Sequence, residues 1–316
     1  MKKPLIILNP AAHSDKAGRL PERLASLCEG AEILMTGMPG DAERIAREAA
    51  EAGASTVIAA GGDGTINEVV NGIMTAGKPG VRLGILPVGT MNVFAVELGI
   101  PLNSLSKAWK IILRGEVRHL DLPISSTAEG SRYFVQLAGV GLDAEVVRRT
   151  TRESKKALGP LSYLLSLAHV AGEKPPPVTL EDGEGMVRSG SFVLIGNGRF
   201  YGGPFTMFRR GSPCDGLIDV LVFRNQSPWD LLRYMHAILI GQHASLEDVE
   251  YFQTTSLALR SESPVPYELD GEMAGYLPLS LRVEKAALSV FAPSPAESTR
   301  SQQRGTEMFP DALISR

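Results

Sequence analysis

The sequence predicts an α/β amino-terminal domain with a mostly parallel sheet, followed by a second domain rich in β-strands that forms a sandwich or a barrel. Over the first 120 residues, short apolar runs alternate with helical patterns, which is typical of βαβ units. The later segments are β-rich and are separated by Gly, Pro and Ser, which is typical of antiparallel sheets. A length of 316 residues suits two domains. We expect domains over residues 1–121 and 122–292, and a disordered tail over 293–316, where the composition turns polar.

Each element of the first domain follows from its own stretch of sequence. Apolar runs predict strands at 5–8, 31–35, 56–60 and 83–86. Helical patterns predict helices at 19–28 and 41–52. The second helix is expected to begin with Asp41 as its N-cap and to end before Gly53.

The second domain is expected to contain strands at 133–137, 191–195, 218–223, 256–260, 265–269 and 279–283. Helices are expected at 144–171, with a break at Gly159-Pro160, and at 228–241 with Ser227 as N-cap. Val290 and Phe291 are expected to pair with either sheet.

Composition narrows the classes of function. The chain has 32 basic and 35 acidic residues, and this net charge of −3 argues against a dedicated nucleic-acid-binding protein. Cys28 and Cys214 make neither a disulfide framework nor a zinc site, which fits a reducing compartment. The apolar run at 5–8 is too short for a signal peptide, and no run reaches the roughly 18 residues that span a bilayer. We expect a cytoplasmic protein whose membrane contact is peripheral.

The first candidate site is the run Gly61-Gly62-Asp63-Gly64-Thr65-Ile66-Asn67-Glu68, which follows the strand at 56–60 and opens a helix. Glycines let the backbone approach a phosphate, and free N–H groups at a helix N-terminus favour negative charge. The run matches neither a Walker loop nor the dinucleotide fingerprint. Asp63 favours metal-assisted chemistry, because a carboxylate in a phosphate cradle is repulsive unless it holds Mg²⁺ or positions a proton. The alternative is a structural turn in which Thr65 and Glu68 form a capping box.

A second loop, at 84–92, follows the next strand and contains Gly89, Thr90 and Asn92. Because ligands of parallel sheets bind at the carboxyl ends of the strands, both loops are expected to face one crevice. The alternative is an ordinary turn in which Asn92 or Thr90 caps the following helix.

With these two loops the chain resembles the diacylglycerol kinase catalytic family, which includes bacterial lipid kinases and sphingosine kinases. The resemblance also covers Asn9-Pro10 and the segments 139–144, 196–203, 215–220 and 270–272. NAD kinases share Gly-Gly-Asp-Gly-Thr, but the later Asp270-Gly271-Glu272 is more typical of the lipid kinases. The resemblance implies an NAD kinase-like α/β domain and a β-sandwich, with the nucleotide in the cleft between them.

The resemblance also implies the site residues. It places ATP against Asn9, Thr36, Gly61, Gly62, Asp63, Gly64, Thr65, Ile66, Asn67, Glu68, Gly89 and Thr90. It implies a Mg²⁺ site with the carboxylate of Asp215 and the backbone carbonyls of Ser212 and Leu217. Glu272 becomes the candidate general base for a lipid hydroxyl, and Asp270 the alternative base. By pattern alone, hairpin turns are the better explanation of Asp215-Gly216 and of 270–272.

A lipid partner at the membrane surface is compatible with a basic run and an apolar run in the second domain. Arg148, Arg149, Arg152, Lys155 and Lys156 precede the apolar stretch 158–170, and such a pair of segments could rest on anionic lipid. The alternative is a solvated face beside a core segment. Arg199, Arg209 and Arg210 are either phosphate contacts or surface residues. No nucleic-acid partner is expected, and the oligomeric state is left open, a homodimer included.

The expected activity is therefore that of an ATP- and Mg²⁺-dependent lipid kinase that converts diacylglycerol to phosphatidic acid in phospholipid biosynthesis. A sphingoid-lipid kinase, an NAD kinase and a noncatalytic nucleotide-binding regulator are the alternatives. The chain departs from the family pattern at Ala12-His13, Pro204 and Cys214, which bears on phosphate contacts, acceptor shape and metal affinity.

Overall fold

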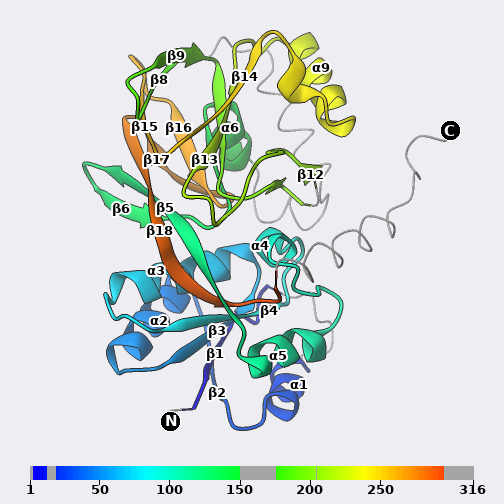
Figure 1. Ribbon diagram of the computed structural model, residues 1–316. Helices are drawn as coiled ribbons and strands as arrows, with labels where there is room; N and C mark the ends of the chain where they lie inside the picture. The colour runs from blue at the N-terminus through cyan, green and yellow to red at the C-terminus, as the bar shows by residue number, and fades with distance from the viewer. Residues whose placement is uncertain (1–2, 13–18, 150–175, 204, 295–316) are drawn as a thin grey trace, which may run out of the picture. The chain divides into compact units, whose positions relative to one another are not determined.

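The computed structural model describes residues 3–12, 19–149, 176–203 and 205–294 (Figure 1). The chain divides into two compact units. Unit 1 contains residues Met1–Leu120 and the segment that begins at Ala287, and unit 2 contains Asp121–Ala286. Residues 287–292 are thus grouped with unit 1, whereas the sequence assigned them to the second domain. Each unit is described separately below.

Unit 1 is built on a parallel sheet with the strand order β2-β1-β3-β4 (Figure 1). The strands are β1 (Leu5–Leu8), β2 (Glu32–Met35), β3 (Thr56–Gly61) and β4 (Arg82–Pro87). Every residue of β1 and β3 is buried, as expected of central parallel strands that are covered on both faces. The end of β18 adds a parallel neighbour to β4, through Ser289 and Val290. The predicted mostly parallel sheet is confirmed.

Five helices are described in unit 1: α1 (Leu20–Leu27), α2 (Asp41–Glu51), α3 (Asp63–Thr75), α4 (Val93–Glu97) and α5 (Leu105–Arg114). Helices α2 and α3 pack closely at Gly72, where a Cβ atom would lie 2.2 Å from the carbonyl oxygen of Glu43. The predicted N-cap of α2 is wrong by one residue. Gly40 is the N-cap, and Asp41 instead accepts hydrogen bonds from the amides of Gly37 (2.8 Å) and Met38 (3.0 Å).

Unit 2 contains two antiparallel sheets. The first has the order β14-β13-β10-β7-β16-β17, and the second includes β18-β15-β8-β9 together with the β5–β6 pair. The strands of the first sheet are β7 (Leu137–Val140), β10 (Phe192–Gly196), β13 (Ile218–Phe223), β14 (Val249–Thr254), β16 (Pro266–Leu269) and β17 (Glu272–Tyr276). The others are β5 (Val117–Thr127), β6 (Gly130–Tyr133), β8 (Val178–Asp182), β9 (Val187–Gly190), β15 (Ser256–Arg260) and β18 (Leu279–Phe291).

The two sheets share one apolar core. Val193, Val220 and Tyr267 of the first sheet belong to the same buried cluster as Leu180 and Leu259 of the second. Inward-facing residues of two sheets that form one core are typical of a β-sandwich. The sequence left a sandwich or a barrel open, and the structure is a sandwich.

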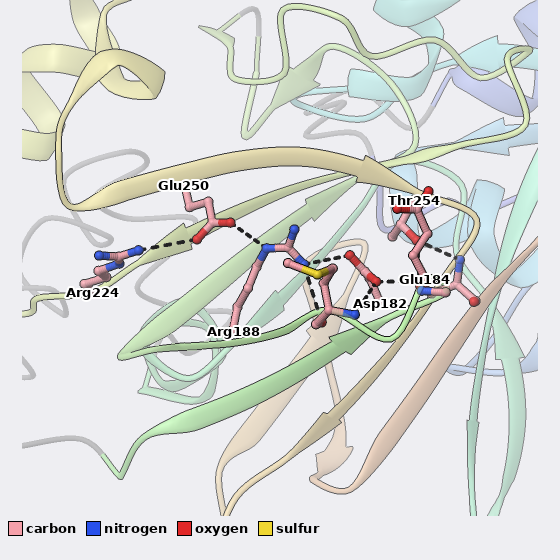
Figure 2. Close-up of polar contacts among 9 residues, drawn as sticks. Asp182, Glu184, Arg188, Arg224, Glu250 and Thr254 are labelled. Atoms are coloured by element: carbon pink, nitrogen blue, oxygen red, sulfur yellow. Dashed lines mark hydrogen bonds and ion pairs between the residues drawn. The ribbon is translucent and has the colours of Figure 1, made fainter.

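An ion-pair network crosses the outer strands of unit 2 (Figure 2). Arg188 on β9 bonds to the carboxylates of Asp182 on β8 (2.7 Å) and Glu250 on β14 (2.5 Å), and its guanidinium lies 3.9 Å from the centroid of the Phe252 ring. The arginine therefore links neighbouring strands of one sheet to a strand of the other. Thr254 accepts the amide of Gly183 beside this network.

Unit 2 also carries helices α6 (Leu142–Arg149) and α9 (Pro228–Leu239), the 3₁₀ turn η1 (His243–Ser245) and the short hairpin strands β11 (Phe200–Tyr201) and β12 (Phe205–Thr206). Ser227 forms a capping box with Asp230 at the start of α9, which confirms the predicted N-cap. The long helix predicted over 144–171 begins at Leu142 in the structure, and its part beyond 149 lies outside the described residues. Most of the predicted tail, 295–316, also lies outside them.

The strand predicted at 133–137 is wrong. The structure has a strand that ends at Tyr133 and another that begins at Leu137. Between them, the amides of Val135 and Gln136 donate to the carboxylate of Asp270 instead of joining a ladder. Within the described part of the chain, no helix is long and apolar enough to cross a membrane.

Candidate functional site

Two glycines bring the loops of unit 1 into direct backbone contact. Gly62 follows β3 and Gly89 follows β4, and these strands are parallel neighbours. A Cβ atom on Gly89 would lie 2.4 Å from the Cα atom of Gly62, so no side chain fits there. The two loops therefore meet at one edge of the sheet, where ligands of parallel sheets bind.

The side chain of Asn92 shapes the second loop. Its amide nitrogen donates to the carbonyl of Gly89 (2.7 Å), and its oxygen accepts the amide of Gly89 (3.2 Å). Asn92 is the N-cap of α4 in a left-handed conformation (φ 51°), but its side chain makes no cap hydrogen bond. Asn92 is therefore the cap residue that the alternative expects, but its side chain closes the Gly89 turn instead of forming a cap hydrogen bond.

Asp63 links the two loops. Its carboxylate accepts the amide of Phe94 (3.1 Å) and other backbone N–H groups at the start of α4. Burial raises the pKa of Asp63 above its usual value, and these hydrogen bonds oppose the rise. The contacts explain an acidic residue here without a metal ion, because a carboxylate at a helix N-terminus is stabilised by the free amides. A role for Asp63 toward ATP remains a prediction.

Asn9 joins the same edge from β1. Its side-chain nitrogen donates to the hydroxyl oxygen of Thr65 in the first turn of α3 (3.0 Å), and its side-chain oxygen accepts the amide of Ala11 (3.0 Å). Thr36 lies just after β2, and its amide donates to Leu8 at the end of β1 (2.9 Å). The structure therefore brings Asn9 together with the first glycine loop and places Thr36 after the neighbouring strand.

The capping-box alternative for the first loop is wrong. Helix α3 begins at Asp63 with Gly62 as its N-cap, so Thr65 already lies inside the helix. Glu68 accepts the amide of Ala42 at the start of α2 (3.1 Å). Ile66 and Asn67 are buried in the helix, and the side-chain oxygen of Asn67 accepts a hydrogen bond from Asn71 (3.1 Å). The side chains of Ile66, Asn67 and Glu68 thus contact other parts of the protein. By contrast, Gly62, Gly64, Gly89 and Thr90 retain some solvent exposure.

In unit 2, the carboxylate of Asp121 holds the Asp215-Gly216-Leu217 turn. Asp215 accepts the amide of Leu217 (3.0 Å), and Gly216 has φ +78°. Asp121, which the sequence did not single out, accepts the amides of Gly216 (2.6 Å) and Ala286 (2.8 Å). The hairpin alternative is wrong here, because the following strand β13 pairs with β10 and β14, neither of which leads into this turn.

The donor set of this turn fits a hard cation. Burial raises the pKa of Asp215, the charge of Asp121 adds to the rise, and that of Lys285 opposes it. A cation would relieve the same repulsion, and oxygen ligands suit Mg²⁺. The carbonyls of Ser212 and Leu217 remain predicted ligands. Among the described residues, no cluster of three or more His, Cys, Asp or Glu side chains could hold a metal ion.

The Asp270-Gly271 turn joins β16 to β17, with Leu269 paired to Glu272. Both turn residues have positive φ, +50° and +82°, so the hairpin turn expected from the pattern is present. The carboxylate of Asp270 accepts the amides of Val135 (2.8 Å), Gln136 (2.9 Å) and Leu137 (3.1 Å). Glu272 is exposed, and no hydrogen bond to its carboxylate is found among the residues that the structure describes. Asp270 is therefore already hydrogen-bonded to backbone amides, whereas Glu272 is exposed to solvent.

The candidate arginines are held by protein groups. Arg209 donates to the carbonyl of Gly241, Arg210 lies over the ring of Tyr251 at 4.8 Å, and Arg199 lies 5.3 Å from the Phe200 ring centroid. In the basic run, Arg148 and Arg149 both pair with Glu145. Arg152, Lys155 and Lys156 lie outside the described residues. Phosphate contact by any of these arginines remains a prediction.

Comparisons with known proteins agree with this architecture. Residues 3–123 match the model of the diacylglycerol kinase catalytic domain, and residues 136–292 match the YegS C-terminal NAD kinase beta sandwich-like domain. A protein of Chromohalobacter salexigens named "Probable lipid kinase YegS-like" is 32% identical, and the match covers 88% of this chain and 91% of that protein. A protein of Bacillus subtilis named "Diacylglycerol kinase" is 32% identical over 76% of this chain and 78% of its own.

Solved structures agree as well. A crystal structure of a Bacillus anthracis protein, provisionally assigned as a diacylglycerol kinase, superposes with a TM-score of 0.77 at 26% identity. The match covers 93% of this chain and 96% of that one. Two family models in the expected order and relatives matched over most of their length lead to one conclusion. The chain belongs to the family of diacylglycerol kinase and YegS-like lipid kinases.

Proposed function

We propose that this lipid kinase transfers the γ-phosphate of ATP to the hydroxyl group of diacylglycerol, with Mg²⁺ as cofactor, and so forms phosphatidic acid and ADP. The observation that carries the proposal is the Asp270–Glu272 turn in a chain of the lipid kinase family. In this turn the carboxylate of Glu272 is exposed, whereas that of Asp270 already accepts three backbone amides. Phosphoryl transfer requires a base for the acceptor hydroxyl, and an exposed carboxylate meets that need.

The first glycine loop supports ATP binding. The amides that open α3 have no intrahelical partner, and the positive end of the helix dipole favours phosphate. Because Gly62 and Gly89 carry no side chains, a phosphate can approach the backbone of both loops. Asn9 and Thr65 present polar groups at the same edge.

Mg²⁺ would be held by Asp215 and by the carbonyls of Ser212 and Leu217, and it would neutralise phosphate charge in the transition state. Asp121 holds the turn through Gly216 and Ala286, so the Asp215 carboxylate is presented by a fixed backbone.

Glu272 is proposed as the base, and Asp270 as the residue that holds the turn. In the reaction, Glu272 takes the hydroxyl proton, the lipid oxygen bonds to the γ-phosphorus atom, and the bond from that atom to the β,γ-bridging oxygen breaks as ADP leaves. Asp270 is less suited to this step, because its oxygens already accept three amides whose hydrogen bonds a proton would disturb.

Product analysis with a panel of acceptors tests the proposal. Purified protein, ATP and Mg²⁺ are incubated with mixed micelles of diacylglycerol, sphingosine, ceramide or monoacylglycerol, and with NAD in solution. We expect phosphatidic acid to form fastest. Selective phosphorylation of sphingosine or NAD would replace the proposed acceptor, and ATP binding without any product would indicate a noncatalytic regulator.

We also propose that the protein contacts an anionic membrane surface through one face of α9 (Figure 1). Trp229, Leu232, Leu239 and Ile240 lie on that face at helical spacing and are 79%, 53%, 65% and 52% exposed, respectively. The opposite face of the helix packs into the core of unit 2. Arg209 reaches the carbonyl of Gly241 just beyond the helix, which adds positive charge beside the apolar face. Tryptophan, aliphatic residues and arginine are the composition of interfacial helices.

Fluorescence tests this surface directly, because Trp229 is exposed and Trp109, the other tryptophan of the chain, is buried. In a Trp109→Phe protein, vesicles with anionic phospholipid should shift the Trp229 emission to the blue, and more strongly at low salt. Leu239→Glu should weaken vesicle binding about tenfold or more, because it removes about 2 kcal/mol of apolar burial.

Leu113→Glu, at an equally exposed leucine of α5, is the matched control and should bind vesicles as the unchanged protein does. A blue shift that appears without vesicles and grows with protein concentration would instead show that a second copy covers the face. Equal binding by the two glutamate variants would also contradict a membrane role for α9.

A further inference from the structure

Two carboxyl groups, that of the fully buried Glu268 and that of the half-buried Asp143, lie behind the turn that carries Glu272. Glu268 lies on β16 with no solvent exposure, and Asp143 lies in the first turn of α6. Both reach over Gly139 of β7. A Cβ atom on Gly139 would lie 2.2 Å from Oδ2 of Asp143 and 2.8 Å from Oε1 of Glu268, so only glycine leaves room for the pair.

One oxygen of Glu268 holds the turn. Oε2 accepts the amide of Gly271 at 2.6 Å, and Gly271 is the residue directly before Glu272. The ladder between β16 and β17 shifts register at Tyr267 and Glu268, and such a bulge redirects the side chains beside it. The backbone that leads into Glu272 is therefore tied to a buried carboxyl group.

The other oxygen of Glu268 requires a proton. No N–H or O–H donor reaches Oε1 from the described residues. The carboxyl groups of Glu268 and Asp143 lie against the same glycine, Gly139, and the two side chains share a hydrogen bond. Two ionised carboxylates would repel each other in this buried position, so the contact requires one proton shared between them. Burial, and then the charge of Asp143, raises the pKa of Glu268 well above its usual value.

The charges that are found to act on Glu268 are negative, so they do not take the place of that proton. Asp270 is the other charged group that acts on Glu268, and it is also acidic. On α6, Glu145 is engaged by Arg148 and Arg149. On β17, the nearest titratable group is Glu272 itself, which is exposed. The charges of Asp143 and Asp270 both act against ionisation of Glu268, which favours its protonated form.

We propose that Glu268, protonated and hydrogen-bonded to Asp143, is a positioning residue that fixes the Gly271 amide and thereby the place of Glu272. This inference rests on the proposed function of Glu272 as base. As pH rises through the raised pKa of Glu268, the shared proton is lost and the two carboxylates repel. The Gly271 amide by itself favours the ionised form, so the loss of positioning comes from displacement of the Glu268 side chain by this repulsion. The positioning effect is complete below that pKa and lost above it, so kcat should have an alkaline limb.

Two substitutions separate positioning from general packing. Glu268→Gln keeps an oxygen for the Gly271 amide and an N–H donor for Asp143 but cannot titrate. Its kcat should stay within about twofold of the unchanged enzyme at neutral pH, and the alkaline limb should disappear. Glu268→Leu removes the acceptor and should lower kcat about 10- to 100-fold with little change in the KM for lipid. A Gln variant as slow as the Leu variant, or one with an unchanged alkaline limb, would overturn the proposal.

A second readout does not depend on catalysis. Hydrogen exchange of the Gly271 amide should be slow in the unchanged protein and in Glu268→Gln, and faster in Glu268→Leu. In the unchanged protein, exchange beyond the intrinsic effect of pH should accelerate over the range in which the carboxyl ¹³C signal of Glu268 titrates. If no lipid is phosphorylated, the proposed function is wrong, but hydrogen exchange still shows whether Glu268 holds the Gly271 amide. Equal exchange in all three proteins would overturn the positioning role.

Discussion

Replacement of Glu272 by Gln should lower kcat for lipid phosphorylation by about 10²- to 10⁴-fold, the range typical of a lost general base. The amide has nearly the shape of the carboxylate but cannot accept the hydroxyl proton. Because Glu272 is exposed at the start of β17, the change should leave the melting temperature within about one degree, as is usual for surface substitutions. Initial rates with diacylglycerol micelles, together with ATP affinity, measure the effect.

Glu262→Gln is the matched control, because it removes the same charge from an exposed glutamate of the loop before β16. It should retain the full rate. If Glu272→Gln also retains a near-normal rate, Glu272 is not the base. If it loses ATP affinity as much as rate, the residue acts in binding instead.

Replacement of Gly89 by Ala should damage the nucleotide site. The new Cβ atom would lie 2.4 Å from Cα of Gly62 and 2.9 Å from Oδ1 of Asn92. Neither the Gly62 backbone nor the hydrogen-bonded amide of Asn92 can move without a large cost in free energy, so both loops must shift. We expect a loss of about 1–3 kcal/mol in the free energy of unfolding and at least a tenfold weaker affinity for ATP.

Gly37→Ala provides the control for stability, because its Cβ atom would meet only Oδ2 of Asp41, at an ordinary 3.6 Å. It should change the free energy of unfolding by less than about 0.5 kcal/mol. Calorimetric titration with ATP and thermal melting measure both proteins. Unchanged ATP affinity in Gly89→Ala would show that the contact between the loops is not part of the nucleotide site.

The sequence predicted elements well where a local pattern determines them. The runs at 5–8 and 218–223 are fully buried strands, and such apolar runs are recognised without knowledge of their partners. Ser227 was recognised as a helix cap because the cap and its partner Asp230 lie within one turn. In these cases the interaction that forms the element lies within a few residues of the chain.

Prediction failed where the determining contact is distant in the sequence. The run at 133–137 has the composition of a strand, but its amides are taken by Asp270. The role of Asp63 toward ATP or a metal stays a prediction, and only the fold shows that its carboxylate also binds the first turn of α4. Glu268 was overlooked, because a lone glutamate in a strand gives no sign that it shares a proton with Asp143. The residue types of the site were readable from the sequence, and their hydrogen-bond partners were not.

The most direct test of the central claim follows the labelled phosphate. The purified protein is incubated with ATP carrying ³²P in the γ position, Mg²⁺ and diacylglycerol micelles, and both ADP and labelled lipid are quantified. We expect labelled phosphatidic acid in equal amounts to ADP, and both products to form at least about 100-fold more slowly in Glu272→Gln. ADP released without labelled lipid, or no turnover of ATP with any lipid alcohol, would contradict the assignment of a lipid hydroxyl as the acceptor.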